Sequence, residues 1–354
     1  MAESKRKTAT IKDIARETNL SPSTVSNYLN GHKVRESTRL LIEAAIEKLQ
    51  YRVNEAAREV RCGRSRIVGI IVPNLQMDYA RSFALHARYQ LERMGFITLV
   101  YDCNSSDAEE MKYVERMMRR RACAIISLPF NPHTEVYQMV MENGTPLITI
   151  GDPIETFNTD RAAIDDTPAF KEMISDLYDA GHTRVGVIMG QLDHSVMGRR
   201  LQVFKDCFEE NFDSLDDNLI LSLPCQTVDS GYTAAYQMMD SPNPPTAIVC
   251  MNSELLTGAH IALMERGLRI PDDISLCGVG INDGRDNASS RRLSIIQQPI
   301  ARLAEGVAQR VRQIYIAGKD GSDLKVSIEI MATYRRAQSI APPPHKKKQI
   351  TTGD

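Results

Sequence analysis

The sequence predicts an α+β multidomain chain, in which an all-helical N-terminal segment precedes two α/β lobes with parallel sheets. Three observations predict this fold class. The length of 354 residues exceeds the roughly 100 to 200 residues of an ordinary domain. Up to about residue 66, apolar residues recur only at helical spacing. From residue 67 onward, short β-branched runs alternate with amphipathic stretches, which is typical of strand–helix–strand units.

The N-terminal segment is predicted to contain short helices and no strand. Its apolar residues recur three or four positions apart, so they fall on one face of each helix. They are Ile11, Ile14, Ala15, Val25, Leu29, Leu41, Ala45 and Leu49. We expect these side chains to form a small helical core.

The rest of the chain alternates between the two kinds of pattern. Predicted strands cover residues 67–72, 96–101, 123–128, 147–150, 184–189, 218–223, 246–250, 274–277, 293–296 and 325–330. Predicted helices cover residues 79–94, 107–120, 167–180, 196–210, 229–240, 253–266 and 300–317. The alternating order predicts parallel pairing, and the number of strands predicts two lobes.

The net charge of −2 conceals two parts of opposite sign. Residues 1–66 carry 14 Lys and Arg against 8 Asp and Glu, which gives +6, so the remainder carries −8. A basic segment attached to an acidic body is typical of a domain that contacts phosphate groups.

Composition excludes several classes of protein. The longest apolar run, residues 67–72, is far shorter than the roughly 20 residues needed to span a bilayer. No apolar stretch follows the N-terminus, so we expect a cytoplasmic protein without a secretion signal or a membrane partner. The seven cysteines include no Cys-x-x-Cys pair and the seven histidines show no ligand spacing, so we predict reduced thiols and no metal site.

Residues 11–30 have the pattern of two short helices joined by a tight turn. Ala15 is small where the two helices approach each other. Asn19 stands where the turn needs a residue that tolerates positive φ. Ser21 as N-cap and Pro22 at the first helical position mark the start of the second helix. Together with the basic charge, this pattern predicts a helix-turn-helix DNA-binding head.

The N-terminal end of the second helix is the end that enters the major groove in such heads. We therefore expect Pro22, Ser23 and Asn27 to contact bases. Asparagine pairs with adenine, serine is tolerant, and the proline ring can contact a thymine methyl group. The expected phosphate contacts are Thr10, Ser21, Ser26 and Asn30.

These features closely resemble the lactose-repressor/galactose-repressor (LacI/GalR) family of bacterial transcription regulators. The matching motifs are Thr10-Ile-Lys-Asp-Ile-Ala, Ser23-Thr-Val-Ser, Leu29-Asn-Gly, Tyr51-Arg-x-Asn54, Arg266-Gly-Leu-Arg-Ile-Pro and Gln298-Pro299. The resemblance covers nearly the whole chain. It implies a homodimer that binds a pseudo-palindromic operator in double-stranded DNA of the bacterial nucleoid. It also implies a two-lobed sensor like that of periplasmic binding proteins.

The resemblance implies the domain boundaries as well. We expect a head at 1–53, a hinge helix and linker at 54–66, a first sensor lobe at 67–165 plus 295–320, a second lobe at 166–294 plus 321–340, and a disordered tail at 341–354. Asn54, Ala57 and Val60 match the hinge that enters the minor groove. Val60 replaces the leucine usual in the family, so we expect a smaller wedge and less bending of the operator. Asn27 replaces the usual arginine, which predicts a different base preference.

The sensor cleft lacks the side chains that the resemblance would lead us to expect. Sugar-binding and purine-binding members carry an arginine and two aspartates where this chain has Gly198, Gly280 and Gly151. Loss of these charge-assisted hydrogen bonds makes a common hexose an improbable effector. A rebuilt effector cleft is expected to use Tyr79, Asp152, Arg199, Gln226 and Asn252.

The sequence therefore predicts a DNA-binding transcriptional regulator, most simply a repressor, that responds to a non-standard small molecule or to a partner protein. A constitutive DNA-binding regulator without an effector is the alternative. A solute-binding protein would lack the basic head. An enzyme is not predicted, because the glycines at 278–284 are followed by no amphipathic helix and no Gly-x-Ser-x-Gly motif exists. We accordingly assign no catalytic residue and no cofactor.

Overall fold

The computed structural model describes residues 9–29, 33–51, 65–129, 134–151, 157–190, 195–210, 215–281, 292–318 and 325–344. The chain divides into two compact units, Met1–Ser65 and Arg66–Asp354. We call the first unit the head and the second the sensor. Among the described residues, no helix is both long enough and apolar enough to span a membrane.

The head is a small bundle of three helices, α1 (Ile11–Thr18), α2 (Pro22–Leu29) and α3 (Glu36–Lys48). Ile14, Val25 and Ile42 are fully buried in its core. Asn19 has φ of 54° in the turn between α1 and α2, as the sequence predicted. The prediction for Leu41 was wrong, because Leu41 is 54% exposed and the neighbouring Ile42 occupies the core.

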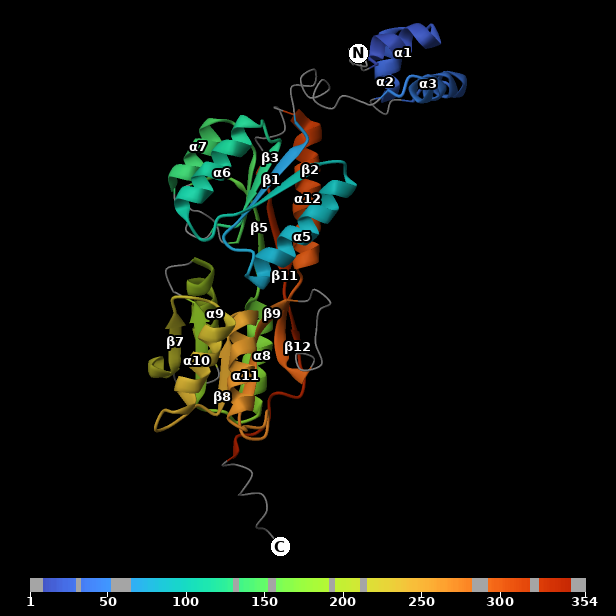
Figure 1. The fold of residues 1–354 in the computed structure, drawn as a ribbon. Helices are drawn as coiled ribbons and strands as arrows, with labels where there is room; N and C mark the ends of the chain where they lie inside the picture. Colours follow the sequence, from blue (N-terminus) through green and yellow to red (C-terminus); the bar gives the residue numbers. More distant parts are fainter. Residues whose placement is uncertain are drawn as a thin grey trace, which may run out of the picture. The chain divides into compact units, whose positions relative to one another are not determined.

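The first lobe of the sensor contains a six-stranded parallel sheet (Figure 1) in the order β11-β5-β4-β3-β1-β2. The strands are β1 (Ile67–Val72), β2 (Ile97–Asp102), β3 (Ala124–Ser127), β4 (Leu147–Ile150), β5 (Asp160–Asp165) and β11 (Ser327–Met331). Its helices are α5 (Asp78–Arg93), α6 (Asp107–Arg119), α7 (Thr134–Glu142) and α12 (Ile300–Ala317).

Alternation along β1 explains how helices cover both faces of this sheet. Val68 and Ile70 belong to the buried cluster that includes residues of α5 and α12. Ile71 points to the opposite face and packs with residues of α6 and α7. Both faces are therefore buried, which explains the uninterrupted apolar run at 67–72.

The second lobe repeats this plan with the sheet order β12-β10-β9-β8-β6-β7. Its strands are β6 (Val185–Gly190), β7 (Ile220–Leu223), β8 (Ala247–Cys250), β9 (Ser275–Ile281), β10 (Ser294–Gln298) and β12 (Thr333–Arg335). The helical elements are α8 (Thr167–Asp179), α9 (Ser195–Glu209), the short 3-10 helix η1 (Asp217–Leu219), α10 (Val228–Met239) and α11 (Ser253–Glu265). β12 pairs antiparallel with β10, and the other pairs are parallel.

The chain passes between the lobes three times, after β5, between β10 and α12, and between β11 and β12. A hydrogen bond joins the first and the third of these passages: the Ala332 amide donates to the Asp165 carbonyl at 2.9 Å. The crossings correct the predicted boundaries of the lobes. β10 belongs to the second sheet, although 295–320 was assigned to the first lobe, because β10 pairs with β9. β11 belongs to the first sheet, although 321–340 was assigned to the second lobe, because β11 pairs with β5.

The C-terminal boundary also differs from the prediction. Ala341 exchanges hydrogen bonds with the Ser275 hydroxyl, which accepts from its amide at 3.1 Å and donates to its carbonyl at 3.2 Å. Pro343 is buried. The expectation of a disordered tail is therefore wrong for residues 341–344, and residues 345–354 lie outside the described part of the chain.

Candidate DNA-binding head and ligand cleft

The start of α2 is fixed by a side-chain cap. The Ser21 hydroxyl accepts a hydrogen bond from the Thr24 amide at 3.1 Å and lies 2.7 Å from the Ser23 hydroxyl. Val25 is fully buried, so it sets the rotation of the helix. Pro22 and Asn27 are exposed, as is Ser23. The three residues predicted to contact bases therefore lie together on the exposed face of α2.

The predicted phosphate contacts are more dispersed. Thr10 is exposed at the start of α1, where its amide donates to Asp13 at 2.9 Å and its hydroxyl donates to the same carboxylate at 2.6 Å. Ser26 is half-buried on α2. Asn30 and the predicted hinge residues Asn54, Ala57 and Val60 lie outside the described residues.

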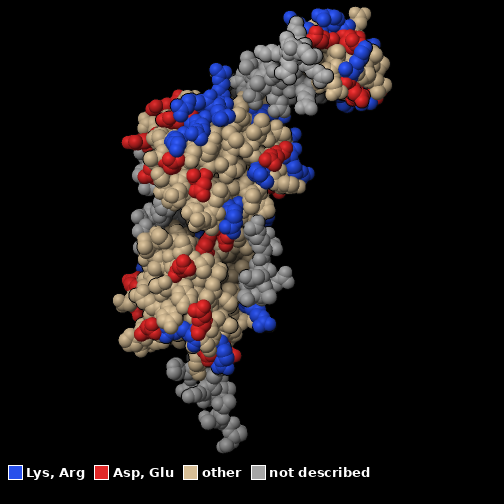
Figure 2. Space-filling model, in the orientation of Figure 1, with Lys and Arg blue, Asp and Glu red and all other residues tan. Residues whose placement is uncertain are grey.

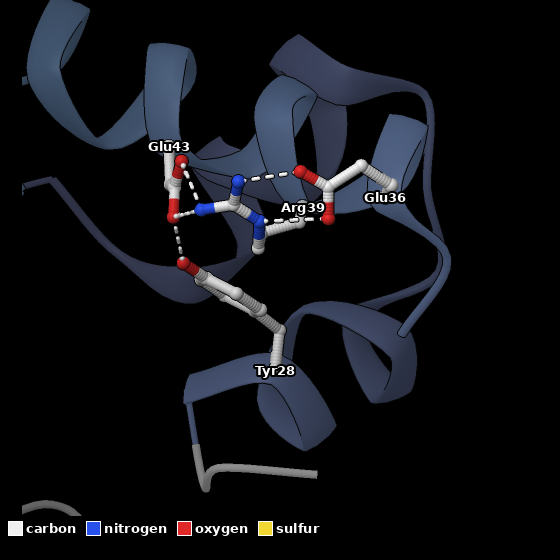
Figure 3. Close-up of polar contacts among 4 residues, drawn as sticks. All are labelled: Tyr28, Glu36, Arg39 and Glu43. Atoms are coloured by element: carbon white, nitrogen blue, oxygen red, sulfur yellow. Dashed lines mark hydrogen bonds and ion pairs between the residues drawn. The ribbon is translucent and has the colours of Figure 1, made fainter. Parts of the chain in front are cut away.

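A polar network joins α2 to α3 (Figure 3). The Tyr28 hydroxyl donates to Glu43 at 2.7 Å. Arg39 donates to the same carboxylate at 2.9 Å, and its Nε donates to the Glu36 carboxylate at 3.1 Å. The hydrogen bond to Glu43 raises the pKa of Tyr28, and the hydrogen bond from Arg39 lowers the pKa of Glu36. These residues are partly exposed, so the network orients the two helices more than it stabilises them.

The sensor holds a cavity of about 150 Å³ between its lobes. The first lobe contributes residues at the ends of β1, β3, β4 and β5 and in the first turn of α5. The second lobe contributes α9, the start of α11 and the end of β9. These are the carboxyl ends of parallel strands, where α/β proteins commonly bind ligands. Figure 2 shows charged side chains scattered over both lobes on a largely uncharged surface.

Four of the five predicted cleft residues line this cavity, namely Tyr79, Arg199, Gln226 and Asn252. Asp152 lies outside the described residues. Gly151 and Gly280 also line the cavity, whereas Gly198 is absent from its described lining. Gly198, which the resemblance placed at the family's arginine position, therefore lies in α9 next to lining residues and does not itself line the cavity.

Asn252 and Gln226 hold each other in place. The Asn252 side-chain amide donates to the Gln226 side-chain carbonyl at 2.8 Å. The Asn252 side-chain oxygen accepts from the Leu255 backbone amide at 2.8 Å. Asn252 is thus the N-cap of α11 as well as a lining residue. A Cβ atom at Gly190 would lie 2.4 Å from the end of the Gln226 side chain, so a larger residue there would displace Gln226 from its observed position.

Arg200 is a cleft residue that the sequence analysis missed. Its side chain is only 8% exposed and donates through Nε to Asp166 at 2.8 Å and through a terminal nitrogen to the Met251 carbonyl at 3.0 Å. Gln298 also contacts Asp166 at 3.4 Å. The helical spacing of the sequence could have indicated its burial. Arg200 lies four and eight residues before Phe204 and Phe208, which are buried on the same face of α9.

At least two hydrogen bonds between described residues span the cleft between the two lobes. Arg199 on α9 donates to the Ile164 carbonyl on β5 at 3.3 Å. The Glu254 carboxylate, at the start of α11, accepts from the Asp78 amide at the start of α5 at 2.6 Å. Burial raises the pKa of Glu254. Glu254 therefore joins the first turn of a helix from each lobe, a contact that requires the cleft to be closed to this degree.

Comparison with known proteins agrees with this two-unit architecture. Residues 10–54 match the family described as bacterial regulatory proteins of the lacI family, and residues 65–320 match periplasmic binding proteins and the sugar binding domain of the LacI family. The repressor PurR of Klebsiella pneumoniae (strain 342) is 27% identical over 341 residues, covering 95% of this chain and 98% of PurR. The repressor CytR of Escherichia coli (strain K12) is 26% identical over 282 residues, covering 78% of this chain and 81% of CytR.

Among solved structures, the Lac repressor dimer bound to operator and the anti-inducer ONPF has the same fold. Its TM-score is 0.78 at 20% identity, and the match covers 95% of this chain and all of that chain. The relatives are repressors of transcription and not enzymes. The three-helix head, the paired α/β lobes and the family match over most of its length together show that this chain belongs to the LacI family of bacterial DNA-binding transcription regulators.

Proposed function

We propose that this protein represses transcription by binding a pseudo-palindromic operator as a homodimer in the bacterial cytoplasm. The observation that supports this most directly is the exposed group Pro22, Ser23 and Asn27 at the capped end of α2. A helix presented in this way can enter the major groove with its N-terminal residues against base edges. Two such heads related by a twofold axis would read two half-sites.

Exposed apolar side chains on the sensor support the dimer. Leu85 and Tyr89 on α5 are 42% and 57% exposed, and Ile97 on β2 is 44% exposed. On α11, Ile261 and Met264 are 39% and 56% exposed. Aromatic residues and Met are enriched at interfaces between proteins, so we infer that these surfaces meet a second copy of the chain.

Asn27→Ala is expected to relax the preference at one base pair in each half-site by about 1 to 3 kcal/mol, because one direct base contact is lost. The measurement is selection of preferred sites from random DNA, followed by affinity measurements on single-base variants. Ser26→Ala is the control on the same helix. It should weaken all sequences alike, since a phosphate contact carries no base information. An unchanged operator motif from Asn27→Ala would contradict the assignment.

Asn54, Ala57 and Val60 are proposed to form a hinge that enters the minor groove. Val60→Leu should tighten operator binding and increase the bend of the operator, because a larger apolar wedge opens the base step further. Circular permutation of the operator within DNA fragments measures the bend. If both the bend and the affinity stay the same, the hinge does not insert at this position.

The sensor cleft is proposed to regulate operator affinity by binding a small molecule other than a common hexose. Tyr79, Arg199, Gln226 and Asn252 line the cavity and, with Asp152, are the residues that we propose contact it. A second proposed way of regulating operator affinity is a partner protein that binds the sensor. The competing proposal is a constitutive regulator without an effector, whose operator affinity would be the same with every metabolite tested.

A further inference from the structure

We propose that the effector of this protein is a small, predominantly apolar molecule about the size of one substituted aromatic ring, and not a polyhydroxylated sugar. This inference rests on the proposed function of the cleft as an effector site and specifies its chemistry. Three features of the cavity carry it: the nature of its walls, the state of its polar groups, and its size.

The walls of the cavity are mostly apolar. Twenty described residues line it, and eleven are aliphatic, proline or aromatic: Pro73, Met77, Tyr79, Ala80, Leu128, Pro129, Ile150, Ile164, Met197, Val279 and Ile281. They come from both lobes, so a ligand between the lobes would meet apolar surface on each side. Such walls favour a ligand that gains from leaving water, and Met and Tyr side chains pack well against aromatic rings.

The polar side chains of the lining already bind the protein. Besides the Tyr79 hydroxyl, seven described lining residues carry them, and each of the seven makes at least one hydrogen bond within the chain: Arg199, Arg200, Gln226, Asn252, Ser253, Glu254 and Gln298. Arg200 neutralises Asp166, and Asn252 caps α11. A sugar has hydroxyl groups around its whole ring, and each one that is buried without a partner costs about 1 to 3 kcal/mol. A sugar in this cavity would compete for described side chains that already hold hydrogen bonds within the chain, whereas an apolar ring would not need them.

The two glycines in the wall add to the apolar character. Gly151 has φ of 116°, a backbone conformation in which an aspartate would be strained. A Cβ atom at Gly280 would lie 3.2 Å from Ile295, so that position tolerates a side chain only if Ile295 shifts. The backbone at Gly151 therefore favours glycine, and the missing carboxylates at both positions leave space beside apolar side chains.

The size of the cavity sets the size of the ligand. A volume of about 150 Å³ matches that of dry apolar cavities that take up a single benzene ring. The ligand that this volume and these walls fit best is a single ring with a short substituent. A disaccharide or a nucleotide would require the lobes to separate and the contact between Glu254 and Asp78 to break.

The test uses the full chain and a defined panel of probes. Phenol, benzoate and phenylacetate represent single-ring compounds, and glucose, galactose and ribose represent sugars. We expect at least one aromatic probe to raise the melting temperature by roughly 5 °C at a hundredfold excess over its Kd and to change operator affinity, and we expect no sugar to do either. Binding of a sugar, or the failure of every aromatic probe at millimolar concentration, would overturn the inference.

Two variants test whether binding occurs in this cavity. Val279→Thr replaces a lining methyl group by a hydroxyl group of nearly the same shape, and Ile164→Thr introduces a hydroxyl group and also removes the terminal methyl group. Each should weaken the aromatic probe about tenfold. Ile316→Thr is the matched control, because Ile316 is 71% exposed on α12 and outside the lining. Equal affinity in all three variants would overturn the assignment to the cavity.

Operator binding without any probe is measured in parallel. Intact operator binding without a response to the aromatic panel contradicts only the inference about the effector. Tight binding of an aromatic probe by a chain that binds no specific DNA contradicts the proposed function and leaves the chemistry of the cavity standing.

Discussion

Raising the salt concentration from 50 to 200 mM is expected to weaken operator binding by about three to five powers of ten. The first 66 residues carry a net charge of +6, and the chain beyond them carries −8, so the head supplies the attraction to DNA. Four or five phosphate contacts from each head would give roughly 8 to 10 in the dimer. Each contact releases condensed counterions. The logarithm of the binding constant therefore falls linearly with the logarithm of the salt concentration, with a slope set by the number of contacts. Fluorescence anisotropy of labelled operator over a salt series measures the slope.

A pair of matched variants identifies where the salt dependence arises. Lys12 is exposed in the first turn of α1, and Lys171 is exposed on α8 of the sensor. Lys12→Gln should reduce the magnitude of the slope by about two, as expected for one lost phosphate contact in each of the two heads, and Lys171→Gln should leave it unchanged. Binding that is insensitive to salt, or a protein that is monomeric at micromolar concentration, would contradict the proposed mode of binding.

Replacing Arg200 by methionine is expected to destabilise the sensor by about 3 to 5 kcal/mol. Arg200 and Asp166 are 8% and 3% exposed and form an ion pair at 2.8 Å. Without the guanidinium group, the Asp166 carboxylate would remain buried with only the Gln298 amide, at 3.4 Å, as a described side-chain donor. The cost arises from this uncompensated buried charge. Urea unfolding of the full chain, followed through the sensor transition, gives the free energy of unfolding.

Two further variants separate charge from packing. Arg200→Met combined with Asp166→Asn should recover much of the lost stability, because neither partner then carries a buried charge. Lys171→Gln serves as the control, since Lys171 pairs with Glu210 at 3.1 Å on the exposed surface. That change should alter the free energy of unfolding by less than about 1 kcal/mol. If Arg200→Met also changes the free energy of unfolding by less than about 1 kcal/mol, the ion pair between Arg200 and Asp166 does not stabilise the lobe.

Much of the fold could be predicted from local sequence patterns. The bounds of β1, β4 and α12 agree with the predicted ranges, and most other elements differ by one or two residues at an end. β5 was missed because its ends, Asp160 and Asp165, are charged and its middle is Ala-Ala. Asp160 is nevertheless 2% exposed, because Arg310 of α12 pairs with it at 2.9 Å and the Val326 amide donates to it at 2.7 Å. No pattern within six residues can indicate a partner 150 residues away.

The candidate site shows the same division. The capped start of α2, the positive φ of Asn19 and the exposure of Asn27 follow from residues close together in the sequence. In the cleft, the resemblance identified four lining residues but missed Arg200 and Glu254. The partners of these two residues, Asp166 and the Asp78 amide, come from other elements and are known only from the folded chain.

The sequence by itself determined the fold class, the helix-turn-helix pattern of the head, and the two α/β lobes. These depend on periodicity, caps and turn residues, which act over three or four positions along the chain. Only the tertiary structure decided that β10 and β11 exchange lobes relative to the predicted boundaries, and that the polar side chains of the cleft are bound to the protein itself. Periodicity shows which face of an element is buried but not which distant element covers it. That choice is made by strand pairing and by the partnering of buried charges, which are contacts between residues far apart in the sequence.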